Sequence, residues 1–426
     1  MLLILACTGT PAEPAAGVLS AADTGPLPEV DEAPGSHTEA PDYALELCQA
    51  ALDCPAGVTE EVQTECFLEV TSAAGEVHYD GPVGAWVRGR SSRSVPKHQY
   101  GVELWDEAGD EVSVDILGMG DESDWILNGQ WFDRSLVRNR LGFDLFQSFG
   151  DEDRYAPELR YCELTLDGAY NGVYTLGERI KRDPDRVDVE ASDVGDSFVL
   201  KQDDATCFHT NVTTHGCWKL VYPSENAITE EQARGVEGWL YAWEMATRSA
   251  DPYDPESGIW AYVDIDSMVD IVLLEEFVKN EDFCWTSLHS WKDEGGKIHF
   301  APWDLDMGYG VFLYYDSYGD PYSWIDYRPE MFAIPGASDE FAARLATRWA
   351  ELRRGPMATE AILARIDAYQ ATLGDAIDRN FERWPIVDIN YGGYLYEVSS
   401  YAEEDARVRG WVEARAAFMD EQVGDW

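Results

Sequence analysis

The sequence predicts an α+β fold, sheet-rich in its first part and mainly helical in its last. Short segments of alternating apolar and polar residues, divided by polar turns, recur between residues 83 and 201. Apolar residues at helical spacing dominate residues 338–422, where Leu345, Trp349 and Leu352 share a face. A hydrophobic fraction of 45% and 16 Trp are enough for a substantial core. We therefore expect sheet early and helix late.

The first part is predicted in detail as follows. Strands at 83–89 and 98–105 alternate and enclose a polar loop. A helix is predicted at 134–149, because Val137, Leu141 and Leu145 recur every four residues. The next predicted elements are a hairpin of 160–166 and 172–176 with its turn around 169–171, and a short strand at 197–201.

Helices and one further hairpin are predicted in the rest of the chain. Residues 229–248 have an amphipathic helical pattern. Residues 266–278 are so apolar that we expect a buried helix. Strands at 287–292 and 297–302 are expected to pair around Glu294-Gly295-Gly296.

The charge of the chain excludes several partners. The formal net charge is -50 and the pI is near 4.2. Such a field repels nucleic acid and anionic membranes, so we expect neither as a partner. An anionic substrate would need local Arg, Lys or metal to bind.

The N-terminal residues predict export. Met1-Leu2-Leu3-Ile4-Leu5-Ala6-Cys7 resembles the end of a lipoprotein signal, with Cys7 as the lipidated residue. Residues 8–42 are rich in Ala, Pro, Gly, Thr and acids and predict a flexible tether before a folded domain at 43–426. We expect a bacterial envelope lipoprotein or an extracellular protein, in contact with the membrane only through the lipid.

The eight cysteines agree with an oxidising compartment. Cys48, Cys54 and Cys66 cluster near the start of the predicted domain. Cys207 and Cys217 bracket a short polar loop and predict a local disulfide; the alternative is a zinc site that adds His209 and His215.

Two acidic clusters carry the chemistry. Asp304 and Asp306 follow an apolar strand and run into a Gly-rich turn, a pattern that suits a divalent cation. Asn280-Glu281-Asp282 lies upstream, at the end of the apolar helix. Together they predict a metal site and a base, the parts of a phosphoryl-transfer site. The alternative is an acidic turn that only caps and solvates.

An ordered series of motifs identifies a family. The chain resembles the CotH kinase family, atypical protein kinases named for a bacterial spore-coat protein, from about Val83 to Val423. The matching segments are Arg88-Gly89-Arg90-Ser91-Ser92-Arg93, Pro96-Lys97-His98-Gln99-Tyr100, Asp124-Trp125-Ile126-Leu127-Asn128, Leu136-Val137-Arg138-Asn139, the stretch from Tyr170 to Asp183, Asn280-Glu281-Asp282, and Pro302-Trp303-Asp304-Leu305-Asp306.

The resemblance implies a two-lobed, protein-kinase-like fold that transfers the γ-phosphoryl group of ATP to Ser or Thr of a protein. It implies Asp282 as the catalytic Asp, supported by Asn280. Asp304 would bind the metal, with Asp306 as a second ligand or a positioning group. Mg²⁺ is expected, although Mn²⁺ and Ca²⁺ also take oxygen ligands.

The nucleotide contacts are predicted less directly. The loop with Arg88, Ser91, Ser92 and Arg93 is a candidate for phosphate binding, or else a charged hairpin loop. Lys97, which enters a predicted strand, is favoured as the phosphate-contacting lysine over Lys201, which ends one. Glu178 and Lys181 are candidates for adenine, ribose, metal or phosphate contacts, or else form a surface ion-pair patch.

Several alternatives stay open. Arg138 and Asn139 orient the site or only hydrogen-bond within the fold, and Asp133 and Asp144 stand where a kinase would have a helix Glu. The alternative function is a catalytically inactive surface or coat protein with a structural or adhesive role; nucleotidyl transfer is a further possibility. We expect a monomer whose protein substrate presents a basic segment.

Overall fold

The computed structural model describes residues 45–60, 62–150, 154–203, 207–210, 217–283, 286–312, 315–326, 328–389 and 396–426. The predicted signal with Cys7 and the predicted tether lie outside these residues, as does Cys284. None of the helices described is long and apolar enough to cross a membrane.

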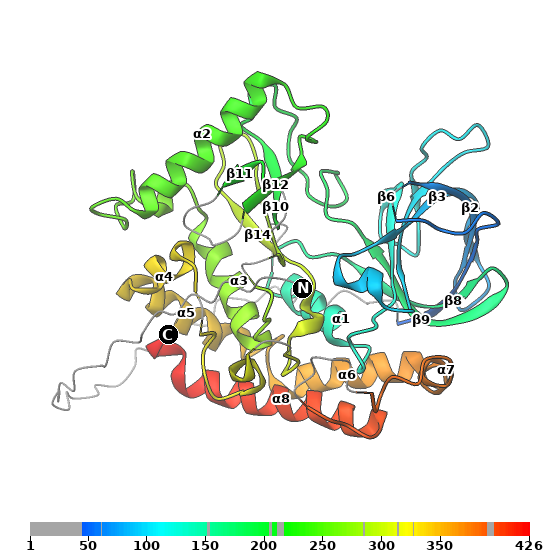
Figure 1. Ribbon diagram of the computed structural model, residues 1–426. Helices are drawn as coiled ribbons and strands as arrows, with labels where there is room; N and C mark the ends of the chain where they lie inside the picture. Colours follow the sequence, from blue (N-terminus) through cyan, green and yellow to red (C-terminus); the bar gives the residue numbers. More distant parts are fainter. Residues whose placement is uncertain are drawn as a thin grey trace, which may run out of the picture. The chain divides into compact units, whose positions relative to one another are not determined.

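A closed β-barrel forms the first part of the described chain (Figure 1). Its strands follow the order β1-β2-β3-β4-β7-β9-β8, and the parallel pairing of β1 with β8 closes it. Cys48 and Cys162 lie opposite each other at that seam and form a disulfide. The strands are β1 Leu47–Asp53, β2 Thr64–Thr71, β3 Val77–Arg88, β4 Gln99–Leu104, β7 Asp124–Asn128, β8 Leu159–Leu166 and β9 Ala169–Glu178.

The barrel interior is apolar because alternate residues of each strand point inward. Leu52, Leu68, Val83, Val102 and Leu176 are fully buried in this core. A second disulfide, Cys54–Cys66, ties the β1–β2 connection. The small pair β5 Val114–Asp115 and β6 Asp121–Glu122 and the 3-10 turn η1 Ser91–Ser94 lie in the barrel's connections.

The predicted hairpin is present, but the predicted position of its turn is wrong. Leu166 pairs with Ala169, so the turn is Asp167–Gly168. Both residues have positive φ, +49° and +74°, as a tight two-residue hairpin requires. Strand β9 therefore already begins at Ala169, in the segment assigned to the turn.

A second sheet follows the barrel, with the strand order β11-β12-β10-β13-β14. Its strands are β10 Phe198–Asp203, β11 His209–Thr210, β12 Cys217–Tyr222, β13 Leu288–Lys292 and β14 His299–Pro302. The Cys207–Cys217 disulfide is present, as predicted. The zinc alternative is wrong, because both thiols are consumed in this bond.

Helices make up most of the last part of the chain, so the predicted α+β order is confirmed. The helices are α1 Arg138–Gln147, α2 Glu230–Thr247, α3 Ile265–Val278, α4 Glu330–Gly336, α5 Asp339–Leu352, α6 Thr359–Leu373, α7 Ala376–Arg383 and α8 Tyr401–Gln422. The short 3-10 turns are η2 Ile259–Ala261, η3 Leu305–Met307, η4 Asp316–Gly319 and η5 Val423–Asp425.

Helix α1 begins four residues later than predicted. Leu136 has a φ of +64°, which a right-handed helix excludes. The carboxylate of Asp133 accepts hydrogen bonds from the backbone N–H groups of Ser135 (3.0 Å) and Arg138 (2.7 Å) and so fixes the entry into the helix.

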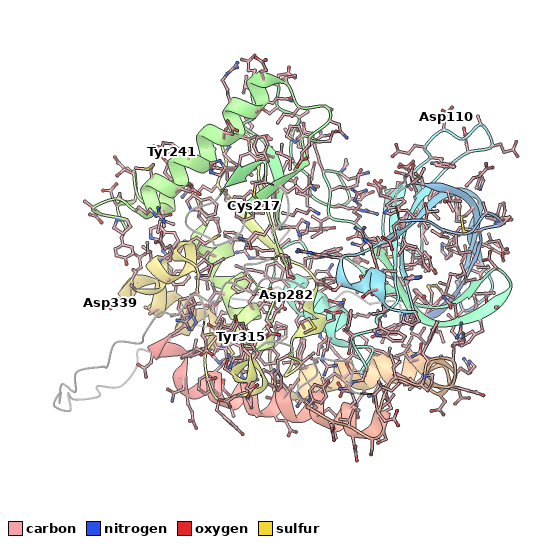
Figure 2. All side chains as sticks on the ribbon, in the orientation of Figure 1. Asp110, Cys217, Tyr241, Asp282, Tyr315 and Asp339 are labelled. Carbon is pink, nitrogen blue, oxygen red and sulfur yellow. A yellow bond between two sulfur atoms is a disulfide. The ribbon has the colours of Figure 1, made fainter. Side chains whose placement is uncertain are left out.

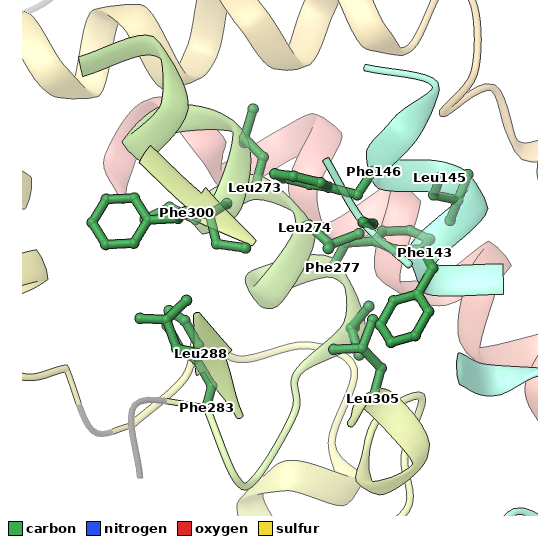
Figure 3. Close-up of a cluster of buried hydrophobic side chains, with 14 of the residues drawn as sticks. Phe143, Leu145, Phe146, Leu273, Leu274, Phe277, Phe283, Leu288, Phe300 and Leu305 are labelled. Carbon is green, nitrogen blue, oxygen red and sulfur yellow. The ribbon is translucent and has the colours of Figure 1, made fainter. Parts of the chain in front are cut away.

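The predicted buried helix 266–278 is α3, and it is the centre of the larger core. Asp264 caps it by accepting from Ser267 N at 2.7 Å. Figure 3 shows its residues Leu273, Leu274 and Phe277 packed beside Phe143 and Phe146 of α1, near Phe300 of β14. This packing brings the ends of α3 and β14 together beside α1.

Candidate functional site

The candidate site begins at the turn after β14. Asp304 adopts the left-handed conformation, φ +55° and ψ +61°, which is uncommon for a residue with a side chain. The turn is fastened to the end of α3: Tyr309 N donates to Val278 O at 2.7 Å, and Glu281 N donates to Met307 O at 3.3 Å. A conformation of this kind persists only where surrounding contacts hold it.

The peptide group between Asp304 and Leu305 is held at both ends. Its carbonyl oxygen accepts a hydrogen bond from Asn280 Nδ2 at 3.3 Å. Its N–H donates to Asn139 Oδ1 at 2.6 Å. Asn139 is 4% exposed and Asn280 is fully buried. The two amides, from α1 and from the end of α3, therefore fix the backbone of Asp304.

Asn280 also fixes the second acidic residue. Its Oδ1 accepts from Asp282 N at 3.1 Å, while its amide nitrogen donates to Asp304 O. The side chain of Asn280 thus connects the segment of Asp282 to the segment of Asp304. Figure 2 shows Asp282 in the region of β14 and α3.

Arg138 completes this support. Its Nε donates to Gly308 O at 3.2 Å, and its guanidinium forms ion pairs with Asp133 and Glu404, each at 2.6 Å. Arg138 is fully buried, and Glu404 belongs to α8. Arg138 and Asn139 thus make hydrogen bonds and ion pairs within the fold, and those of Asn139 lie at the backbone of Asp304.

The acidic side chains lie close enough to influence one another. Burial raises the pKa of Asp306 well above its usual range, and the charges of Asp304, Asp133 and Asp282 raise it further. Burial also raises the pKa of Asp304, opposed by the positive charge of Arg88. The charges of Asp282 and Asp304 thus both act on the Asp306 carboxyl, which holds its proton more tightly than an exposed Asp does.

The cationic side chain of Arg88 lies beside Asp304. Arg88, at the end of β3, interacts electrostatically with Asp304, and its guanidinium lies 5.6 Å from the centre of the Trp303 ring. Burial lowers the pKa of Arg88 to about 10, a value that still leaves it charged at neutral pH. An arginine guanidinium is chemically suited to bind a phosphate oxygen.

The pKa of His289 shows that other cationic side chains lie near Arg88. Its pKa is lowered to about 3, first by burial and then by the positive charges of Lys201, Arg88 and Arg179. It is therefore neutral at physiological pH. Lys201 pairs with His289 across β10 and β13. We refer to Arg88, Lys201 and Arg179, whose charges all act on His289, as the positive surface.

Other predicted residues lie in different surroundings. Lys97 is buried; its Nζ donates to Val173 O at 2.6 Å and to Asn380 Oδ1 at 2.8 Å. Asn380 Oδ1 also accepts from Val173 N at 3.0 Å. Lys97 therefore links strand β9 of the barrel to α7.

Glu178 and Lys181 lie at one rim of the barrel. Glu178 is buried and accepts from Tyr155 Oη at 3.0 Å and Glu158 N at 2.9 Å. Lys181 forms ion pairs with Glu122 at 2.9 Å and Asp124 at 2.8 Å. These contacts follow the pattern of the ion-pair patch considered above.

The loop after Arg88 is closed on itself. Arg93 Nε donates to Gly89 O, and Ser94 Oγ donates to Ser91 O at 2.7 Å. Ser92 is buried, and its side chain covers the α-carbon of Gly89, where a Cβ would collide with it. Gly89 has a φ of +101°, so glycine is required there.

The aspartates considered in place of a helix Glu are engaged elsewhere. Asp133 pairs with Arg138 at 2.6 Å. Asp144 lies 3.6 Å from Arg140 and accepts from Tyr369 Oη at 2.5 Å. Both therefore stabilise α1 and its surroundings.

His289 and Arg179 are the site residues that the sequence reading missed. Neither residue has a role predicted from the sequence, although Arg179 lies within the matching stretch from Tyr170 to Asp183. A usable signal for Arg179 was its basic charge in a chain so rich in acids. No pattern marked His289.

Asp304 and Asp306 are the residues that the sequence predicts as metal ligands. Within the described ranges, no group of three or more His, Cys, Asp or Glu is placed to hold a metal ion. Mg²⁺, however, is commonly held by one or two carboxylates, with water and phosphate oxygens as the other ligands. Asp304 and Asp306 could supply one or two such carboxylates, and Arg88 lies beside Asp304.

Comparison with known families agrees with this geometry. The family model described as "CotH kinase protein" matches residues 86–419, most of the chain. The protein therefore belongs to the CotH kinase family, as the ordered motifs predicted. A comparison with curated proteins gives no significant match.

Proposed function

We propose that this protein is an ATP-dependent protein kinase that phosphorylates Ser or Thr hydroxyl groups of a protein substrate. The observation that carries the proposal is the bridge made by Asn280, which holds Asp282 and Asp304 in one site with Arg88 opposite. The barrel and the helical part would act as the two lobes of a kinase-like fold. Membership of the CotH kinase family supports the same reaction.

In this proposal each residue has a defined task. The carboxylate of Asp282 orients the substrate hydroxyl and receives its proton. The hydroxyl oxygen bonds to the γ-phosphorus, the bond to the bridging oxygen of the β-phosphate breaks, and ADP leaves with those electrons. Asp304 and Asp306 would hold a divalent ion, which neutralises charge on the phosphates when bound.

The positive surface would bind the remaining phosphate charge. Arg88 is the first candidate because it already interacts with Asp304. Lys201 is favoured over Lys97 as the phosphate-contacting lysine, because its charge acts at His289 together with that of Arg88. Lys97 is occupied between β9 and α7.

The compartment and the substrate class are also part of the proposal. The Cys48–Cys162, Cys54–Cys66 and Cys207–Cys217 disulfides fit an extracellular or secreted protein. With a net charge of -50, a basic segment of the substrate would be attracted to the surface.

Transfer of labelled phosphate tests the proposal. The full chain is incubated with γ-labelled ATP, Mg²⁺ or Mn²⁺ and a basic test protein, beside Asp304→Asn and the control Asp110→Asn. Asp110 is exposed on a barrel loop away from Asp282 (Figure 2). We expect metal-dependent labelling in the wild type and the control, and loss in Asp304→Asn.

The opposite results are equally informative. Equal labelling by Asp304→Asn would remove Asp304 from the site. No labelling and no ATP binding by the wild type would favour the alternative, an inactive surface or coat protein.

A further inference from the structure

The outer face of β3 leads directly into the candidate site. Val83, Ala85 and Val87 are buried in the barrel interior. Because neighbours in a strand alternate, Gly84, Trp86 and Arg88 lie on the outer face. Arg88 reaches Trp303 and Asp304 from the end of this row. Trp86 is the next residue back along the same face.

The indole of Trp86 lies across β4. Trp86 is opposite Gly101 in the β3–β4 register. A Cβ built on Gly101 would lie 2.3 Å from two indole carbons of Trp86 and 2.8 Å from its nitrogen. One face of the ring therefore packs on the backbone of β4, and only glycine leaves room for it.

The other side of the ring is not used by the core. Among the described residues, none of the hydrophobic core clusters includes Trp86, which is half-buried. Ile126, next in the same cross-strand row, is on the outer face and yet buried. The half-buried indole of Trp86 is thus the accessible part of this apolar row, two residues from Arg88.

We propose that Trp86 is the stacking platform for the adenine base of the bound nucleotide. The proposal rests on the proposed function and adds the residue that recognises the base. At about 3.3 Å per residue, Trp86 lies about 7 Å along β3 from Arg88. A nucleotide whose phosphates contact Arg88 and the ion at Asp304 can place its base over the indole. Stacking on an aromatic ring is available to every base.

Trp105 provides a matched comparison. Its indole covers Gly84 in the same manner, with a built Cβ 2.3 Å from the ring. Its N–H donates to Glu103 at 2.8 Å, and that carboxylate disfavours an anionic nucleotide. Gly84 is four residues from Arg88, about 13 Å along the strand. Trp105 therefore packs on a glycine as Trp86 does, but we expect no nucleotide contact for it.

Equilibrium dialysis of the full chain with Mg²⁺ tests the proposal, with labelled ATP and labelled tripolyphosphate as the two probes. Trp86→Leu should weaken ATP binding by about 5- to 150-fold and leave tripolyphosphate binding unchanged. Trp86→Phe, which keeps a ring, should retain most of the ATP affinity. Trp105→Leu should bind both probes as the wild type does.

The contrary outcomes separate this inference from the kinase proposal. If Trp86→Leu binds ATP like the wild type, the platform is wrong and the phosphate site stands. Equal loss of both probes in Trp86→Leu and Trp86→Phe also overturns it, since stacking concerns the base alone. If the wild type binds neither probe, the nucleotide site and the proposed function fail together.

Discussion

Asn139 of α1 accepts a hydrogen bond from the backbone N–H of Leu305 at 2.6 Å, across 166 residues of sequence. Asn280 donates a hydrogen bond to the carbonyl oxygen of the same peptide group. A left-handed Asp304 held in this way points its carboxylate without depending on a bound ion. Two buried amides thus impose the backbone geometry at Asp304.

Replacing Asn139 should impair the reaction more than the fold. Asn139→Ala leaves the buried Leu305 N–H without its acceptor, at a cost of about 1–3 kcal/mol of stability. We expect a clear fall in kcat for the folded variant. Gln147→Ala is the control, because Gln147 lies on the same helix and donates to Ala156 O at 2.6 Å, away from the site. Equal activity of the two variants, measured per folded molecule, would refute the positioning role.

Asp282 and Asp304 should fail in different ways. Asp282→Asn removes the base and should lower kcat by about 10²- to 10⁴-fold while ATP binding persists. Asp304→Asn should weaken the binding of metal-bound ATP as well. Single-turnover kinetics and dialysis on the same preparations separate the two effects. Loss of ATP binding in Asp282→Asn would place this carboxylate among the metal ligands instead.

Glu178 should make stability depend on pH. Burial raises its pKa from 4.5 to about 7, with the charge of Arg186 opposing the shift. The folded protein therefore holds the proton more tightly than the unfolded chain does. This contribution to stability is complete below pH 4.5 and is lost as the pH rises through about 7.

Urea unfolding across that window provides the measurement. Relative to wild type, Glu178→Gln should gain stability as the pH is raised from about 5 to about 8. Glu69→Gln, on an exposed position of β2, should keep the wild-type profile. Parallel curves for wild type and Glu178→Gln would show that Glu178 titrates normally.

Loss of the Cys48–Cys162 disulfide should destabilise the barrel. The bond closes a loop of 114 residues at the β1–β8 seam. We expect the double variant Cys48→Ala/Cys162→Ala to lose about 2–5 kcal/mol of unfolding free energy. Denaturant titration measures this, and the Cys54–Cys66 pair, with a separation of 12, should lose less when replaced in the same way. A smaller effect for the longer loop would contradict the chain-entropy explanation.

Much of the fold could be predicted because it depends on local pattern. The buried helix α3, the strands β3, β4, β13 and β14, and the Cys207–Cys217 disulfide follow from apolar spacing and short loops. The barrel could not be predicted. Its closure depends on the parallel β1–β8 pairing, a contact between distant segments that no local pattern encodes.

Some residues of the candidate site could likewise be predicted from the sequence, and others could not. Asp282 and Asp304 stand out because they follow apolar elements and carry the motifs. The environment of Lys97 and Glu178 depends on α7 and on the barrel rim, so their burial could not be seen in the sequence. His289 was missed because its proximity to Arg88 and Arg179 exists only in the folded chain.

Barrel closure also limits how other proteins can be recognised. An open sheet offers the unpaired N–H and C=O groups of its edge strands to any extended peptide. The closed order β1-β2-β3-β4-β7-β9-β8 uses those groups internally. A partner of the barrel must therefore be recognised through side chains, and an extended segment gains nothing by adding to it as another strand. Closure of the barrel thus removes the exposed edge through which one sheet could add to another.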